Sequence, residues 1–170
     1  MNISKAIQLA LECYRAGNFQ QAELICKKIL KKQPDNANIL RLLGVICYQF
    51  KNNSSALQYF KKTIQIDPTD ALAYYNLGIL THEKGHLDEA ITYYEKAIQL
   101  NSNIAETYYN LGIAFQKKEQ IDKAVAYYQK ALQLNPSYAD AYYNLGTILK
   151  QQGRMGYSLL HRPIRKLLLL

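Results

Sequence analysis

The stretch that decides the fold is Ala71–Ile104, ALAYYNLGILTHEKGHLDEAITYYEKAIQLNSNI. Its opening string YYNLG, at residues 74–78, returns at residues 108–112 and 142–146, each time 34 residues later. A second landmark keeps the same interval, because alanine stands at positions 22, 56, 90 and 124. A fixed period of this length is the signature of a repeat array, in which each unit buries its apolar face against its neighbours.

The period divides the chain into four full repeats and part of a fifth. The full repeats cover residues 3–36, 37–70, 71–104 and 105–138, and the partial fifth covers residues 139–153. Within each repeat, apolar residues recur at helical spacing in two blocks. A short polar break such as Lys84-Gly85-His86 separates the blocks. The pattern predicts two helices per repeat, here termed helix A and helix B, and one all-α array over residues 1–153.

Gly78 lies inside a predicted helix A, where glycine costs roughly 0.8–1 kcal/mol relative to alanine. Four of the five repeats keep glycine at this position, at residues 44, 78, 112 and 146. Some interaction must therefore offset the cost. We expect the backbone of helix B to cross helix A there, opposite Ala90, with Tyr74 and Tyr94 filling the gaps on either side.

The pattern resembles the tetratricopeptide repeat family, whose 34-residue unit carries Leu-Gly, alanine, aromatic and proline residues at set positions. The resemblance covers residues 3–153, and the third and fourth repeats match it best. The first repeat departs most, with Ala6, Ala10 and Cys26 where the family has an aromatic residue, glycine and an aromatic residue. The resemblance implies an all-α, right-handed α-solenoid of helix-turn-helix repeats, with the A helices on the concave side.

Residues 154–170 do not continue the array. Gly156, Ser158 and Pro163 stand where helix B of the fifth repeat would run, and proline inside a helix costs about 3 kcal/mol or more. The segment also holds four basic residues and no acid, and it ends in four leucines. We expect an atypical tail, truncated or artificial in origin, and self-association through this end of the chain stays an alternative.

Composition narrows the class of partner. The net charge of +8 arises from 21 basic and 13 acidic residues, and the basic excess within the array clusters at residues 27–32. Such a cluster near a helix end is typical of a solvated surface. Tyrosines do not interleave with it as base stacking requires, so we expect no nucleic-acid partner. No apolar run is long enough to span a membrane.

Candidate catalytic and metal-binding groups are scarce. Cys13, Cys26 and Cys47 show no disulfide or metal-ligand spacing, so we expect reduced thiols in a cytoplasmic protein. His82 and His86 flank a turn and lack a carboxylate spaced as a zinc site requires. No serine-histidine-aspartate order or phosphate-binding glycine loop stands out. We therefore expect no catalytic residue, metal or cofactor, and no enzyme.

A partner-binding face is predicted from the helix A positions that are not assigned to the core. Repeat positions 4, 7, 8 and 11 are assigned to the core, so positions 2, 5, 6, 9, 12 and 13 of helix A point away from helix B. The predicted concave-face residues are Arg41, Val45, Gln49, Tyr75, Asn76, Ile79, His82, Tyr109, Asn110, Ile113, Gln116, Lys117, Tyr143, Asn144, Thr147 and Lys150.

On this face, asparagine follows tyrosine in three repeats, at residues 75–76, 109–110 and 143–144. An asparagine amide offers a donor and an acceptor, so it pairs with a peptide backbone whatever the peptide's side chains. Tyrosine adds a large contact area with a polar tip. The pattern favours a scaffold that binds an extended segment of another protein in its groove. The alternative is that these side chains only satisfy neighbouring repeats.

Two other functions remain open. Asn76, Asn110 and Asn144 resemble the asparagine ladder of tetratricopeptide arrays attached to O-linked N-acetylglucosamine transferases, which implies an array that recruits substrates for a larger glycosyltransferase-type enzyme. The other is a structural module that assembles with itself. A clamp for terminal carboxylates, a further mode within the family, is disfavoured because Glu106 would repel such a group.

Overall fold

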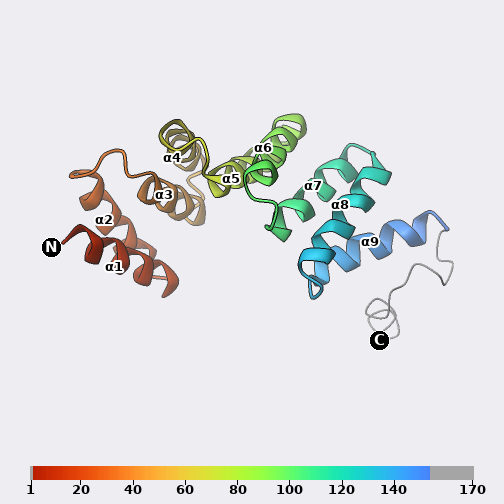
Figure 1. Cartoon of the computed structure of the whole chain (residues 1–170), viewed down its shortest axis with the longest axis horizontal. Helices are drawn as coiled ribbons and strands as arrows, with labels where there is room; N and C mark the ends of the chain where they lie inside the picture. Colours follow the sequence, from red (N-terminus) through yellow and green to blue (C-terminus); the bar gives the residue numbers. More distant parts are fainter. Residues whose placement is uncertain (1, 154–170) are drawn as a thin grey trace. The chain divides into compact units, whose positions relative to one another are not determined.

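The computed structural model describes residues 2–153 and shows an all-α chain over that range. The helices in order are α1 (Ile3–Arg15), α2 (Phe19–Leu30), α3 (Ala37–Gln49), α4 (Asn53–Ile66), α5 (Ala71–Glu83), α6 (Leu87–Leu100), α7 (Ala105–Lys117), α8 (Ile121–Leu134) and α9 (Ala139–Gln151) (Figure 1). The tail predicted at 154–170 lies outside the described residues.

The helices pair as hairpins within two compact units, one that holds α1 to α6 and one that holds α7 to α9. In the first unit α1 packs on α2, α3 on α4 and α5 on α6, while α2–α3 and α4–α5 contacts join successive hairpins. In the second unit α7 packs on α8, and α8 packs on α9 (Figure 1). The predicted all-α solenoid of helical hairpins is confirmed.

The glycine inside helix A makes room for an aromatic ring of helix B. A Cβ built on Gly78 would overlap the ring of Tyr94, and one built on Gly112 would overlap the ring of Tyr128. Both rings are buried. The expectation that Ala90 and the helix B backbone occupy this place was wrong: the nearest atoms belong to the Tyr94 ring.

A second buried stripe of helix A, at repeat positions 3 and 10, was missed in the sequence. Ala73 and Leu80 of α5 are almost fully buried, as are Ile39 and Ile46 of α3. Leu80 belongs to a cluster with Phe60 of α4, so this stripe carries the contact between successive hairpins. The sequence did carry a signal for this stripe. In the second to fifth repeats, positions 3 and 10 hold only aliphatic residues and alanine, apart from the small residue Thr107.

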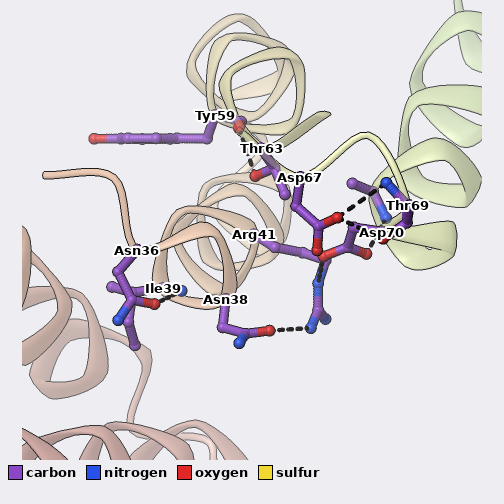
Figure 2. Close-up of polar contacts among 10 residues, drawn as sticks. Asn36, Asn38, Ile39, Arg41, Tyr59, Thr63, Asp67, Thr69 and Asp70 are labelled. Carbon is purple, nitrogen blue, oxygen red and sulfur yellow. Dashed lines mark hydrogen bonds and ion pairs between the residues drawn. The ribbon is translucent and has the colours of Figure 1, made fainter. Parts of the chain in front are cut away.

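Side-chain caps begin several helices. Asn18, Asn36, Asn52 and Asp70 each accept a hydrogen bond from the backbone N–H three residues further on, at 2.9–3.3 Å (Figure 2 shows Asn36 and Asp70). Each cap satisfies an N–H that the first helical turn leaves unpaired and contributes ~1 kcal/mol. The residues that precede α7, α8 and α9 make no such bond.

The turn from helix A to helix B needs a left-handed residue. Gly17 and Gly85 take this place in the first and third repeats, with φ of 75° and 81°. The second and fourth repeats instead hold Lys51 and Glu119 there, with φ of 60° and 58°. A residue with a Cβ is strained in this conformation by roughly 1–2 kcal/mol. These two turns are therefore weak points of the array.

The contact between the Tyr94 ring and Gly78 yields a stability prediction. We expect Gly78→Ala to lower the free energy of unfolding by about 1–2 kcal/mol, because overpacking against Tyr94 outweighs the gain in helix propensity. Gly146→Ala is the matched control, since nothing among the described residues lies within 4 Å of a Cβ there. The control should be neutral or stabilising in urea denaturation followed by circular dichroism. Equal shifts for the two variants would contradict the packing.

The strained turns yield a second prediction. We expect Lys51→Gly and Glu119→Gly each to raise the free energy of unfolding by about 0.5 kcal/mol, since relief of the left-handed strain exceeds the added entropy of the unfolded chain. Lys84→Gly is the control, because Lys84 has a φ of −77° and glycine gains nothing there. Thermal melts should rise for the first two variants and fall for the third. A fall for all three would reject the strain.

Candidate functional site

The predicted face residues all lie on A helices. Most are half-buried, which leaves part of each side chain open to a ligand, whereas Gln49, Lys117, Tyr143 and Lys150 are exposed. The first unit holds the members on α3 and α5, and the second unit holds those on α7 and α9. The face is therefore described below for each unit separately.

In the second unit, a hydrogen-bond network joins three helices. The side-chain amide of Asn144 on α9 donates to the hydroxyl of Tyr109 on α7 at 3.2 Å, and to that of Tyr128 on α8 at 3.5 Å. Tyr128 in turn donates to Oε1 of Gln116 at 2.7 Å. Four side chains from one A–B hairpin and the next A helix are thereby held in fixed orientations.

The tyrosines of the two successive repeats differ in this unit. The Tyr109 ring lies against Tyr128, at 5.8 Å between centroids, and against Tyr138, at 4.7 Å. Tyr143, one repeat later, is 74% exposed. Tyr109 is thus a fixed part of the surface, while Tyr143 projects from it. The predicted row of equivalent tyrosines is uneven.

In the first unit, helix B again reaches the face of helix A. The Tyr94 ring of α6 contacts Tyr75 at 6.2 Å and His82 at 6.4 Å between centroids. The expectation that the predicted concave-face residues point away from helix B is therefore only partly right. Tyr94, which the sequence predicted as a core filler beside Gly78, therefore also contributes to the face, as its counterpart Tyr128 does in the second unit. A buried tyrosine hydroxyl needs a polar partner, and that requirement was the available signal.

Polar bonds also join successive A helices in the first unit. Arg41 of α3 donates from Nε to Oδ2 of Asp70, the residue that caps α5, at 2.7 Å, and from Nη2 to Asn38 at 3.2 Å (Figure 2). Tyr48 of α3 donates a short hydrogen bond to Glu83 of α5. Arg41 was predicted as a partner-binding residue, yet its guanidinium already holds an ion pair inside the array.

A short loop keeps Asp70 in place for this ion pair. Oδ1 of Asp67 accepts hydrogen bonds from the hydroxyl and the backbone N–H of Thr69, at 2.6 and 2.9 Å (Figure 2). The bond from the Thr69 hydroxyl, followed by that from its N–H, lowers the pKa of the Asp67 carboxyl. The loop thus favours an ionised Asp67 and delivers Asp70 to both the α5 cap and Arg41.

The tyrosine hydroxyls on the face keep their protons at neutral pH. Burial, and then the hydrogen bond to Glu83, raise the pKa of Tyr48 to about 12. Burial is also the main reason why the pKa of Tyr94, Tyr128 and Tyr109 is raised above the usual value. These hydroxyls therefore act as neutral donors and acceptors.

Other reactive groups contribute little to the face. Within residues 2–153, no group of three or more His, Cys, Asp and Glu side chains has a metal-binding arrangement. The three cysteines are free thiols, and burial raises the pKa of Cys26 to about 12. Over the same part of the chain, no helix combines the length and the apolar character that a membrane crossing needs.

Four tetratricopeptide repeat family models match the chain, at residues 14–77, 80–119, 105–138 and 127–157. A search of curated proteins by sequence finds no match.

Solved structures give the same family. The crystal structure of MamA is 30% identical, with a TM-score of 0.74, and the match covers 85% of this chain and 84% of MamA. PilF of Pseudomonas aeruginosa is 23% identical, with a TM-score of 0.82 and coverage of 89% and 69%. YrrB, described as a tetratricopeptide protein with an unusual peptide-binding site, is 20% identical, with a TM-score of 0.71 and coverage of 91% and 79%. With its period, its stacked hairpins and these matches, the chain belongs to the tetratricopeptide repeat family, whose members bind other proteins.

Proposed function

We propose that this chain is a non-catalytic scaffold whose A helices bind an extended peptide segment of another protein. The observation that carries the proposal is the recurrence of one half-buried tyrosine–asparagine–aliphatic pattern on the A helices, at 75–76 with Ile79 and at 109–110 with Ile113. A residue needed only for the core would be fully buried, and one needed only for solubility would be fully exposed. Half-burial leaves each of these side chains a packed base and a part exposed to solvent.

Unused hydrogen-bonding capacity supports a peptide backbone as the ligand. The amide nitrogen of Asn144 is committed to Tyr109 and Tyr128, but within residues 2–153 its carbonyl oxygen accepts no hydrogen bond. That oxygen suits the N–H of a peptide, and the network behind it fixes its direction. Over the same range the side chain of Asn76 forms no hydrogen bond, so its donor and acceptor both remain available. A side chain that is already oriented loses less entropy on binding.

The apolar part of the face supplies contact area. Tyr75 and Ile79 in the first unit, and Tyr109 and Ile113 in the second, are each half-buried on their helices. The Tyr109 ring already lies against two other rings, so a ligand that packs on its exposed part restricts little further rotation. Ring stacking and aliphatic contact depend weakly on peptide sequence, which suits a scaffold with more than one partner.

The carbohydrate-transferase alternative rests on one observation, the repetition of asparagine at residues 76, 110 and 144. If that likeness to arrays of O-linked N-acetylglucosamine transferases extends to function, the same face recruits substrates for a larger enzyme. Both functions use the face in the same way, so the peptide-binding proposal does not depend on the choice. A cytoplasmic location remains an expectation from the reduced cysteines.

The proposal predicts a loss of peptide binding without loss of fold. A peptide is first selected against the full chain from a library of random unstructured peptides, and its Kd is measured by calorimetry. In the variant Asn76→Ala, Asn110→Ala and Asn144→Ala, we expect binding to weaken by about 2–4 kcal/mol, because each amide–backbone pair contributes roughly 0.5–1.5 kcal/mol. The helical circular dichroism should be unchanged.

A matched control removes three exposed amides of B helices, Gln58→Ala, Gln65→Ala and Gln129→Ala. The control should bind the selected peptide with the parent Kd. If the asparagine variant binds as tightly as the control, the asparagines serve only to join the repeats. Failure to select any peptide would reject the proposed function itself.

A further inference from the structure

A pocket lies at the first hairpin, away from the tyrosine–asparagine face. Its volume is about 300 Å³. Its lining combines an apolar floor with three basic side chains: Ile3, Ala6, Lys28, Ile29, Lys31 and Lys32. The floor comes from α1 and α2, and the lysines come from the last turn of α2 and the residues that follow it.

One wall of the pocket is a helix A position at which the first repeat lacks the tyrosine of the third and fourth repeats. In the third repeat, Tyr74 of helix A meets Tyr93 of helix B at 6.4 Å between ring centroids, and the fourth repeat has the same pair at 108 and 127, also at 6.4 Å. The first repeat has Ala6 and Ile25 at these two positions. Ala6 lines the pocket, so the space that the helix A ring fills in the third and fourth repeats is open here, whereas Ile25 is buried in the core. An aromatic side chain is the group that this hollow fits.

The rim of the pocket is also specific to the first repeat. Lys28 stands at a position that is lysine in all four full repeats, but Lys31 and Lys32 replace glutamine and an aliphatic residue of the other three. All three lysines are exposed, and within residues 2–153 none takes part in an ion pair or hydrogen bond. A favourable interaction with the helix dipole explains one basic residue at a helix end. The helix dipole does not explain why three lysines surround a pocket.

We infer that this pocket docks an acidic segment of a partner protein, with one aromatic side chain inserted between α1 and α2 and flanking carboxylates paired with the lysines. The aromatic ring takes the place of the missing helix A tyrosine, and the carboxylates pair with the lysines of the rim. The chain's own residues 154–170 do not fit this description, because they carry four basic residues and no acid. The site is separate from the face proposed above and serves a second contact.

Recognition of this kind has two parts of unequal range. The lysines attract an acidic segment from a distance and raise the rate of encounter, in a way that salt weakens. The ring then displaces water from an apolar floor, which contributes to affinity at any salt concentration. Neither part alone gives specificity for an acidic peptide with an aromatic centre.

The test uses a fluorescein-labelled peptide Asp-Glu-Phe-Glu-Asp and the full chain, with fluorescence anisotropy as the readout. We expect saturable binding that weakens roughly tenfold when phenylalanine is replaced by alanine, or when the acids are replaced by their amides. Lys28→Glu with Lys32→Glu should weaken binding by at least as much. Lys61→Glu with Lys130→Glu is the control, since it changes net charge equally at exposed positions on other B helices.

A second variant tests the hollow without changing charge. Ala6→Tyr restores the helix A tyrosine of the third and fourth repeats and should abolish binding while the helical circular dichroism is kept. Absence of binding by the parent chain, or equal weakening by the two lysine variants, would overturn the proposal. So would concentration-dependent dimers in light scattering that the filled pocket abolishes, because the occupant would then be a second copy of this chain.

Discussion

The contact between a ring of helix B and a glycine of helix A sets the distance between the two helices of a hairpin. Tyr94 on Gly78 and Tyr128 on Gly112 leave no space for a single additional carbon. The first repeat meets the same constraint differently, because Ala10 and Cys26 stand at these positions and both are fully buried. A larger residue on helix A is matched by a smaller one on helix B. The sum of the two volumes, rather than either residue, is what the fold requires.

The same contact explains how a core residue serves the surface. Tyr128 packs against Gly112, and its hydroxyl lies among side chains of the face predicted to point away from helix B. Tyr128 reaches Gln116 and Asn144 in this way. The polar groups of the face are therefore oriented by a ring that the core holds rigidly. Packing and recognition share one side chain, and a substitution there would alter both.

The sequence alone predicts the helices well, because its 34-residue period is exact at the residues that begin the A helices. Ala37, Ala71, Ala105 and Ala139 open the second to fifth repeats in the alignment and also begin α3, α5, α7 and α9. Periodicity reports which residues are equivalent, and equivalent residues fold alike. It carries less information on which side chains meet.

The site was harder to predict for that reason. Arg41 pairs with Asp70, 29 residues away, and the pair depends on a capping residue in the next repeat. The first-repeat pocket depends on Ala6, which is small where the third and fourth repeats have tyrosine, so this departure from the consensus mattered more than the matches. The asparagines can bind a partner only with hydrogen-bonding groups that neighbouring repeats do not already use. No repeat pattern shows which groups these are.

The repeats of this array are not interchangeable cassettes, despite their common length. Repeat position 24 is phenylalanine, at Phe60, where position 12 is Tyr48. It is tyrosine, at 94 and 128, where position 12 is His82 or Gln116. Where helix B lacks a hydroxyl at Phe60, helix A supplies one at Tyr48 and sends it to Glu83 of the following repeat. Exchange of α4 for α6 or α8 would bring two hydroxyls together in the second repeat and leave the acceptor Gln116 or its counterpart without one in the other. Duplication of a repeat within such an array would therefore preserve these contacts only if positions 12 and 24 were copied together.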